Sequence, residues 1–179
     1  MANTYTLISS NVLSSSAASV TFSSIPSTYT DLVLRCSTRS NYAAEWQGLF
    51  LVAFETSVSY NYAGTILSGD GSAAASGRYT ANSGIGLAWD ATQTYGANSA
   101  NNTANTFSSS ETYIPNYTGT ATKQTSNFLV GEANTTLGRM QVSAASTPYT
   151  SAITTLQVRD IISTFAIGSS FYLYGIKNS

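Results

Sequence analysis

The chain has 179 residues, and only 8% of them are charged, against about 25% in an ordinary soluble domain. Its polarity comes mainly from hydroxyl groups, because 29 Ser and 25 Thr together fill 54 positions. With 42% hydrophobic residues and 12 Tyr, the chain is too apolar to be disordered, so a single folded domain over residues 1–179 is expected.

The charge distribution argues against several classes of partner and cofactor. The formal net charge is −1 and the seven basic residues are scattered, so no basic patch for nucleic acid is expected. No charged segment precedes an apolar stretch as in a signal peptide, and the longest apolar run, residues 49–54, is too short to span a membrane. The single cysteine, Cys36, has no partner for an internal disulfide and is expected to pack as a small buried side chain.

Apolar residues recur with a period of two along most of the chain. Residues 1–10 are interpreted as a candidate arm that adds a strand to a neighbouring chain. After them, the alternation places these residues on shared faces of strands: Val20 with Phe22; Leu32 with Leu34 and Cys36; Leu156 with Val158. No twelve-residue stretch keeps a helical stripe, and clusters of Gly, Ser, Asn and Pro separate the alternating runs. The sequence therefore predicts an all-β protein, an antiparallel, jelly-roll-like β-sandwich of about eight to ten short strands.

The segment "WQGLFLVAFET", residues 46–56, is apolar on both faces of a strand. Phe50, Val52 and Phe54 alternate with apolar residues on the opposite face, which is typical of a strand covered on both sides. Residues 69–106, rich in Gly, Ala, Ser and Asn, are then expected to be long excursions from the sheet.

The closing "SSFYLYGIKNS" is also apolar on both faces, with Phe171 and Leu173 alternating with Tyr172, Tyr174 and Ile176. One face belongs to the core, and the other needs either a covering loop or another subunit, since an apolar outer patch marks an interface. The candidate oligomer or partner interface consists of five aromatic residues from these two segments: Trp46, Phe50, Phe54, Tyr172 and Tyr174.

Signs of catalytic chemistry are weak. Histidine is absent, which removes the commonest general base and metal ligand, and one thiol cannot build a zinc site. The eight carboxylates form no paired or motif-like context, and Asp160 is better explained as the partner of a cation or a turn. We therefore expect neither an enzyme nor a cofactor nor a metal.

Tyrosines in or beside loop-like stretches offer a binding surface. They are Tyr60, Tyr62, Tyr79, Tyr95, Tyr113, Tyr117 and Tyr149. Such rings stack on sugars, and they also give protein contact area at low entropic cost. The sequence does not separate the two, although no concentrated Trp/Asp/Asn group supports the glycan alternative.

The opening "YTLISSNVLSSSAASVTFSSIPSTYTDLVLRCSTRS" (residues 5–40) and the closing "ITTLQVRDIISTFAIGSSFYLYGIKNS" (residues 153–179) resemble small virion proteins of tailed bacteriophages, especially marine and cyanobacterial ones. The resemblance implies a jelly-roll-like sandwich with a structural, non-enzymatic role, made in the host cytoplasm and carried on the virion. It supplies no functional residues, and residues 41–152 match nothing of this family.

Two functions follow from these observations. The first is a capsid decoration (cement) protein, a homotrimer that binds the major capsid protein on the outer shell and stabilises it by mass action. The second is a tail fibre or receptor-binding protein that recognises host surface glycans through the Tyr-bearing loops. A third, a depolymerase enzyme, has no catalytic pattern behind it.

Overall fold

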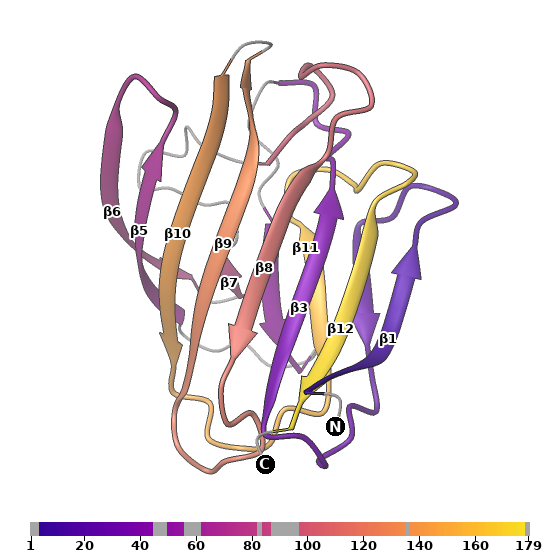
Figure 1. Cartoon of the computed structure of the whole chain (residues 1–179), viewed down its shortest axis with the longest axis vertical. Helices are drawn as coiled ribbons and strands as arrows, with labels where there is room; N and C mark the ends of the chain where they lie inside the picture. Colours follow the sequence, from indigo (N-terminus) through magenta and orange to yellow (C-terminus); the bar gives the residue numbers. More distant parts are fainter. Residues whose placement is uncertain are drawn as a thin grey trace.

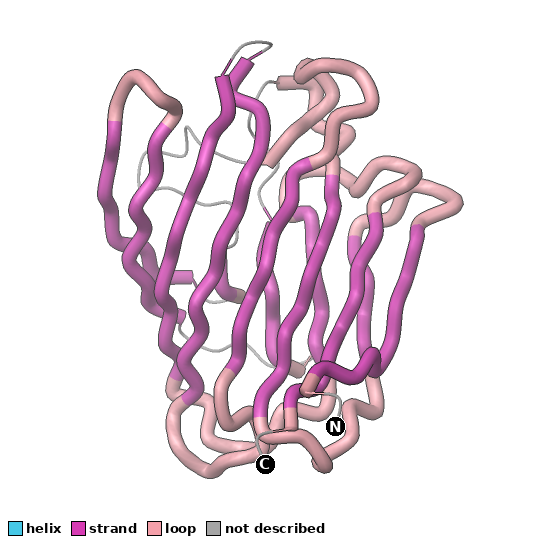
Figure 2. Tube along the Cα trace, viewed as in Figure 1, coloured by secondary structure: helices cyan, strands magenta, loops and turns pink. Residues whose placement is uncertain are grey.

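The structure, a computed structural model, describes residues 4–44, 50–55, 62–81, 84–86, 97–134 and 137–177. Within these ranges all regular structure is β, and twelve strands form two antiparallel sheets (Figure 2). The predicted all-β antiparallel sandwich is confirmed. The expected eight to ten strands were too few, because several polar and small-residue stretches are also paired.

The larger sheet has eight strands and the smaller has four. The larger runs in the order β1 (Tyr5–Val12), β12 (Ser170–Ile176), β3 (Asp31–Thr38), β8 (Ser108–Ile114), β9 (Lys123–Asn134), β10 (Leu137–Thr147), β5 (Tyr62–Gly69) and β6 (Ala74–Ala81). The smaller runs in the order β2 (Ser19–Phe22), β11 (Leu156–Asp160), β4 (Phe50–Phe54) and β7 (Ile85–Gly86). Figure 1 shows the larger sheet in front, with β11 and β7 behind it.

The strands pair in a nested pattern. β12 lies between β1 and β3, and β11 lies between β2 and β4. The pattern closes with β3 beside β8 and β4 beside β7. The hairpins β5–β6 and β9–β10 are insertions between these strands, and both add to the larger sheet beyond β8. We call the four added strands, β9, β10, β5 and β6, the extension; they lie on the left in Figure 1.

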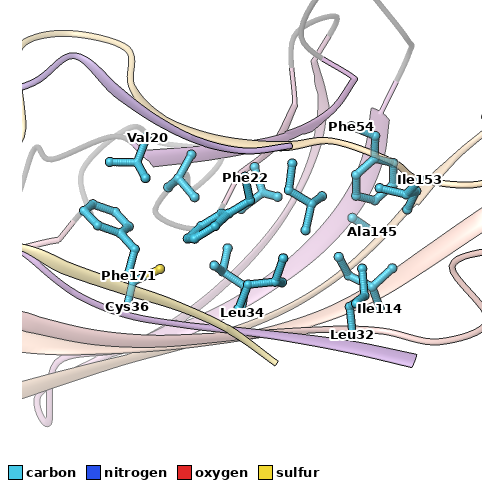
Figure 3. Packing of buried hydrophobic residues seen from close by; sticks show 14 of the residues in the cluster. Val20, Phe22, Leu32, Leu34, Cys36, Phe54, Ile114, Ala145, Ile153 and Phe171 are labelled. Atoms are coloured by element: carbon cyan, nitrogen blue, oxygen red, sulfur yellow. The ribbon is translucent and has the colours of Figure 1, made fainter. Parts of the chain in front are cut away.

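The core lies between the two sheets, where the period of two predicts it. Leu34 on β3 and Phe171 on β12 are fully buried and face Phe22 on β2 (Figure 3). Cys36 is buried in the same layer, as predicted, and its burial raises the pKa of the thiol to about 12. Burial of each large apolar side chain contributes roughly 1.5–3 kcal/mol, so this layer dominates the stability of the fold.

Both doubly apolar segments occupy interior strands. β4 buries Val52, Ala53 and Phe54, so it is covered on both sides as the pattern predicts. β12 buries Phe171 and Leu173 completely and is hydrogen-bonded on both edges, to β1 and β3. The apolar closing segment is therefore an internal strand of the sheet. The candidate arm is not free in this chain either, because residues 5–10 belong to β1 and pair with its own β12.

Residues 69–106 are only partly an excursion, which corrects the expectation. The stretch Ala74–Ala81 forms β6 and pairs along its whole length with β5. The turn before it is fixed by Asp70, whose Oδ1 accepts hydrogen bonds from the backbone N–H groups of Ser72 (2.9 Å) and Ala73 (2.9 Å). Main-chain hydrogen bonds to β5 thus define β6, whose small residues show no alternation of apolar and polar side chains.

Candidate binding face

The outer face of the larger sheet, which points away from the smaller sheet, carries the features that bear on function. Its two halves differ in character. The half formed by β1, β12, β3 and β8 carries aromatic side chains and the charged residues Arg35 and Glu111, and the extension carries exposed aliphatic side chains and Phe128, with Arg78 on β6 at its edge.

Within the extension, β9 and β10 have an inverted polarity. On β9 the inner residue Asn127 is 3% exposed, while the outer residue Phe128 is 42% exposed. On β10 the inner residue Gln141 is 2% exposed, and Met140 beside it on the outer face is 51% exposed. Soluble sheets normally bury the apolar face and expose the polar one, so this reversal predicts that another molecule covers the outer face.

The exposed apolar side chains of the extension form one patch. The register places Val142 opposite both Phe128 and Leu67, and it places Met140 opposite Val130. We call these five residues the apolar patch: Leu67, Phe128, Val130, Met140 and Val142. Because neighbouring strands lie about 4.8 Å apart, side chains paired across them are in contact range and present a continuous surface.

On β9 and β10 the buried inner face carries polar contacts beside the core residues Leu129 and Ala145. The Asn127 amide donates hydrogen bonds to Ser143 Oγ (3.1 Å) and Thr125 Oγ1 (3.4 Å). At the far end of β9, Lys123 is 2% exposed; its ammonium donates to the carbonyl groups of Gly119 and Ala121, and burial lowers its pKa. These polar side chains are buried and bond to other parts of the same chain, so they are not available to bind a partner.

A second group of side chains crosses the other half of the outer face and ends on β9 at the edge of the extension. Successive pairs in the register place Tyr172, Arg35, Glu111 and Phe128 side by side on β12, β3, β8 and β9. We call these four residues the polar row. Arg35 Nε donates a 2.7 Å hydrogen bond to Glu111 Oε2, and this contact raises the pKa of Arg35.

Two tyrosines hold the guanidinium of Arg35 from one side. Its Cζ lies 5.6 Å from the ring centre of Tyr5 and 5.9 Å from that of Tyr174. The two rings meet edge to face, with centres 6.4 Å apart. Cation–π contact with both rings and the ion pair with Glu111 together fix an arginine that is half exposed.

Shallow hollows lie along the outer face. One, of about 530 Å³, is lined by the polar row together with Ser37, Ser109 and Ser170. Another, of about 600 Å³, lies over small residues of the extension, including Ala63 and Ala144, with Arg78 at its border. A smaller one, of about 160 Å³, lies between them and shares Glu111 and Phe128 with the first.

The structure separates the five predicted interface residues. Tyr172 and Tyr174 lie on the outer face and are half-buried. Phe54 is a core residue rather than an interface residue, because it is fully buried and packs against Tyr62 and Tyr149. The backbone of Phe50 belongs to β4, but its side chain, like the whole of Trp46, lies outside the described residues.

Sequence reasoning missed the apolar patch. Its signal was the alternation in "QTSNFLV" and "RMQVSA", which shows two faces but does not say which of them is inward. The polar residues alternating with Phe128 and Val142 would ordinarily be assigned to solvent, so the pattern by itself favours the wrong face.

Most of the tyrosines proposed for a loop surface are structural. Tyr62, Tyr79, Tyr117 and Tyr149 are buried, so they present no ring to a ligand. Tyr113 is half-buried on β8, and its hydroxyl donates a 2.7 Å hydrogen bond to Asp31, which raises the pKa of Tyr113 to about 12. Tyr60 and Tyr95 lie outside the described residues.

Several carboxylates organise turns and loops. Asp160 accepts hydrogen bonds from Ser40 Oγ (2.6 Å) and from the backbone N–H of Ile162 (3.1 Å), which confirms its predicted place at a turn. Glu132 accepts hydrogen bonds from Thr103 and Thr106, and these hold its pKa below the usual value. In the described part of the chain no three residues among His, Cys, Asp and Glu come together as metal ligands. A helix long and apolar enough to cross a membrane is also missing from that part.

The chain matches no protein-family model, no curated protein and no solved structure. The resemblance of its two ends to phage virion proteins therefore stays a prediction, and the function has to be argued from the outer face.

Proposed function

We propose that this chain is a structural protein of a tailed-bacteriophage particle, a capsid decoration protein that binds the outer shell and stabilises it. In this role the apolar patch packs against the major capsid protein, and the chain assembles as a homotrimer. The observation that carries the proposal is the inverted polarity of β9 and β10, which leaves four large apolar side chains exposed on the outer face beside Leu67 of β5.

Burial of the patch would supply the binding free energy. Removing apolar surface from water contributes about 25 cal/mol per Å². Each bound copy buries its own patch, so the total stabilisation of the shell grows with the number of copies bound. A ligand that binds only the assembled shell stabilises it by mass action. Because no charged residue belongs to the patch, its binding should depend little on ionic strength.

The strand order supports a jelly-roll interpretation of the sandwich. Without the two inserted hairpins, the remaining eight strands form two four-stranded sets with the orders β1-β12-β3-β8 and β2-β11-β4-β7. This is the pairing expected of a jelly roll, an architecture frequent in viral capsid and lectin domains. Architecture alone does not fix function, so it adds to the argument from the patch and does not replace it.

The experiment that tests the proposal is localisation on purified particles, by antibody labelling or by imaging at a resolution that separates shell from tail. We expect density for this chain distributed over the shell, and sedimentation equilibrium of the isolated protein should give the mass of three chains. Density confined to the tail would rule out the decoration role, and a monomer in solution would rule out the homotrimer.

A further inference from the structure

The hollow beside the apolar patch has the chemistry of a ligand site. We propose that the polar row, together with Ser37, Ser109 and Ser170, binds a neutral saccharide. This inference goes beyond shell decoration and does not depend on it, because the hollow lies mostly over β12, β3 and β8 and shares only Phe128 with the apolar patch.

The dimensions suit a short oligosaccharide. Three strand spacings separate Tyr172 from Phe128, a length of about 14 Å. The hollow of about 530 Å³ lies within the range typical of small-molecule sites, about 300–1,000 Å³. The three serines supply small, polar rim groups that leave room for sugar hydroxyls.

The charged pair at its centre is held in place, but several of its hydrogen-bonding groups have no partner in the described part of the chain. Among the described residues, Arg35 makes one hydrogen bond, from Nε, and Glu111 accepts only that bond, at Oε2. Both Nη groups of Arg35 and Oε1 of Glu111 are therefore left for a ligand, while Tyr5 and Tyr174 hold the guanidinium in place. An exposed ion pair of this kind contributes little to stability, but a fixed donor beside a fixed acceptor lowers the ordering cost of binding.

The arrangement of charge favours a neutral, hydroxyl-rich ligand. A sugar hydroxyl accepts from the guanidinium and donates to the carboxylate, so neighbouring hydroxyls satisfy both groups at once. An anionic or a cationic ligand would meet a like charge within the same hollow. Tyr172 and Phe128, at opposite ends of the row, offer aromatic surface for the C–H faces of sugar rings.

A peptide strand fits this site less well. Peptides that add to sheets pair with a free edge, whereas β3 and β8 are interior strands whose main-chain groups are already used in the sheet. The site on strands also differs from a surface built of loop tyrosines, most of which are buried.

The test is a glycan array, followed by NMR titration of the ¹⁵N-labelled protein with maltotriose, cellotriose and chitotriose, and with sialyllactose as an acidic comparison. We expect binding to at least one neutral glycan, with shifted amide resonances on β12, β3 and β8. Arg35→Met should weaken that binding about tenfold or more, because it removes hydrogen bonds to a charged group. Ser109→Trp, which fills the hollow but leaves both Arg35 and Glu111 in the chain, should abolish it.

Arg78→Met is the matched control, because Arg78 lies on the same sheet but borders the other hollow. It should leave saccharide binding unchanged. Absence of binding to every neutral glycan, preference for acidic glycans, or full binding by the Arg35→Met and Ser109→Trp proteins would each overturn the proposal. None of these results bears on whether the chain sits on the shell, so the two proposals fail separately.

Discussion

At the scale of single residues, close contacts in the larger sheet depend on glycine. Gly175 on β12 lies directly beneath the ring of Tyr29, so close that a Cβ at this position would collide with the ring atoms Cγ, Cδ1 and Cδ2. Tyr29 is partly buried and packs against the core. A side chain on Gly175 would therefore displace a ring that packs against the core.

Gly175→Ala is expected to destabilise the protein by about 1–3 kcal/mol, the usual effect of overpacking a well-filled site. Urea denaturation measures the change. Gly138→Ala on β10 is the control, because a Cβ there meets nothing within 4 Å. Adding Tyr29→Ala to Gly175→Ala should remove most of the penalty that belongs to the collision; strictly additive effects of the two changes would show that the ring does not cause it.

At the scale of elements, alternation predicted the faces of some strands and not of others. For β3, β11 and β12 the apolar face is the inner face, as the sequence indicates. For β9 and β10 most large apolar side chains lie on the outer face, and polar residues such as Asn127 and Ser143 are hydrogen-bonded to each other on the inner face. β6 was missed since its small residues carry no alternation, and only pairing with β5 defines it.

The closing strand gives the sharpest test at this scale. Removing residues 171–179 deletes Phe171 and Leu173 from the core, at roughly 2–5 kcal/mol for each large side chain, against a total stability of about 5–15 kcal/mol. It also leaves β1 and β3 without the strand between them. We expect this protein to show no cooperative thermal unfolding by circular dichroism, whereas removal of residues 177–179 alone should preserve the transition. A sharp transition in the shorter chain would show that β12 is dispensable.

At the scale of the whole molecule, the sequence predicts the sandwich but not the face that binds. The predicted interface consists of aromatic residues from segments that are apolar on both faces of a strand. This criterion includes Phe54, which lies in the core, as well as Tyr172, which lies on the surface. The apolar patch arises only when β5 is placed beside β10, although about 70 residues separate the two strands along the chain. Strand order and long-range register are set by the whole fold, so a local pattern cannot reveal such a surface.

The patch also yields the last prediction. Val142 lies at the centre of the patch, flanked by Phe128 and Leu67. Val142→Asp would therefore place a carboxylate where the proposed interface excludes water most completely. Burying an unpaired charge is strongly unfavourable, so binding of the purified protein to particles that lack it should fall by at least about tenfold in co-sedimentation. Ser146→Asp, exposed on the same strand and face but outside the patch, should bind as the unchanged chain does. If Val142→Asp instead binds normally, the extension does not contact the shell; if it lowers the mass of the isolated protein, a second copy of this chain is what covers the patch.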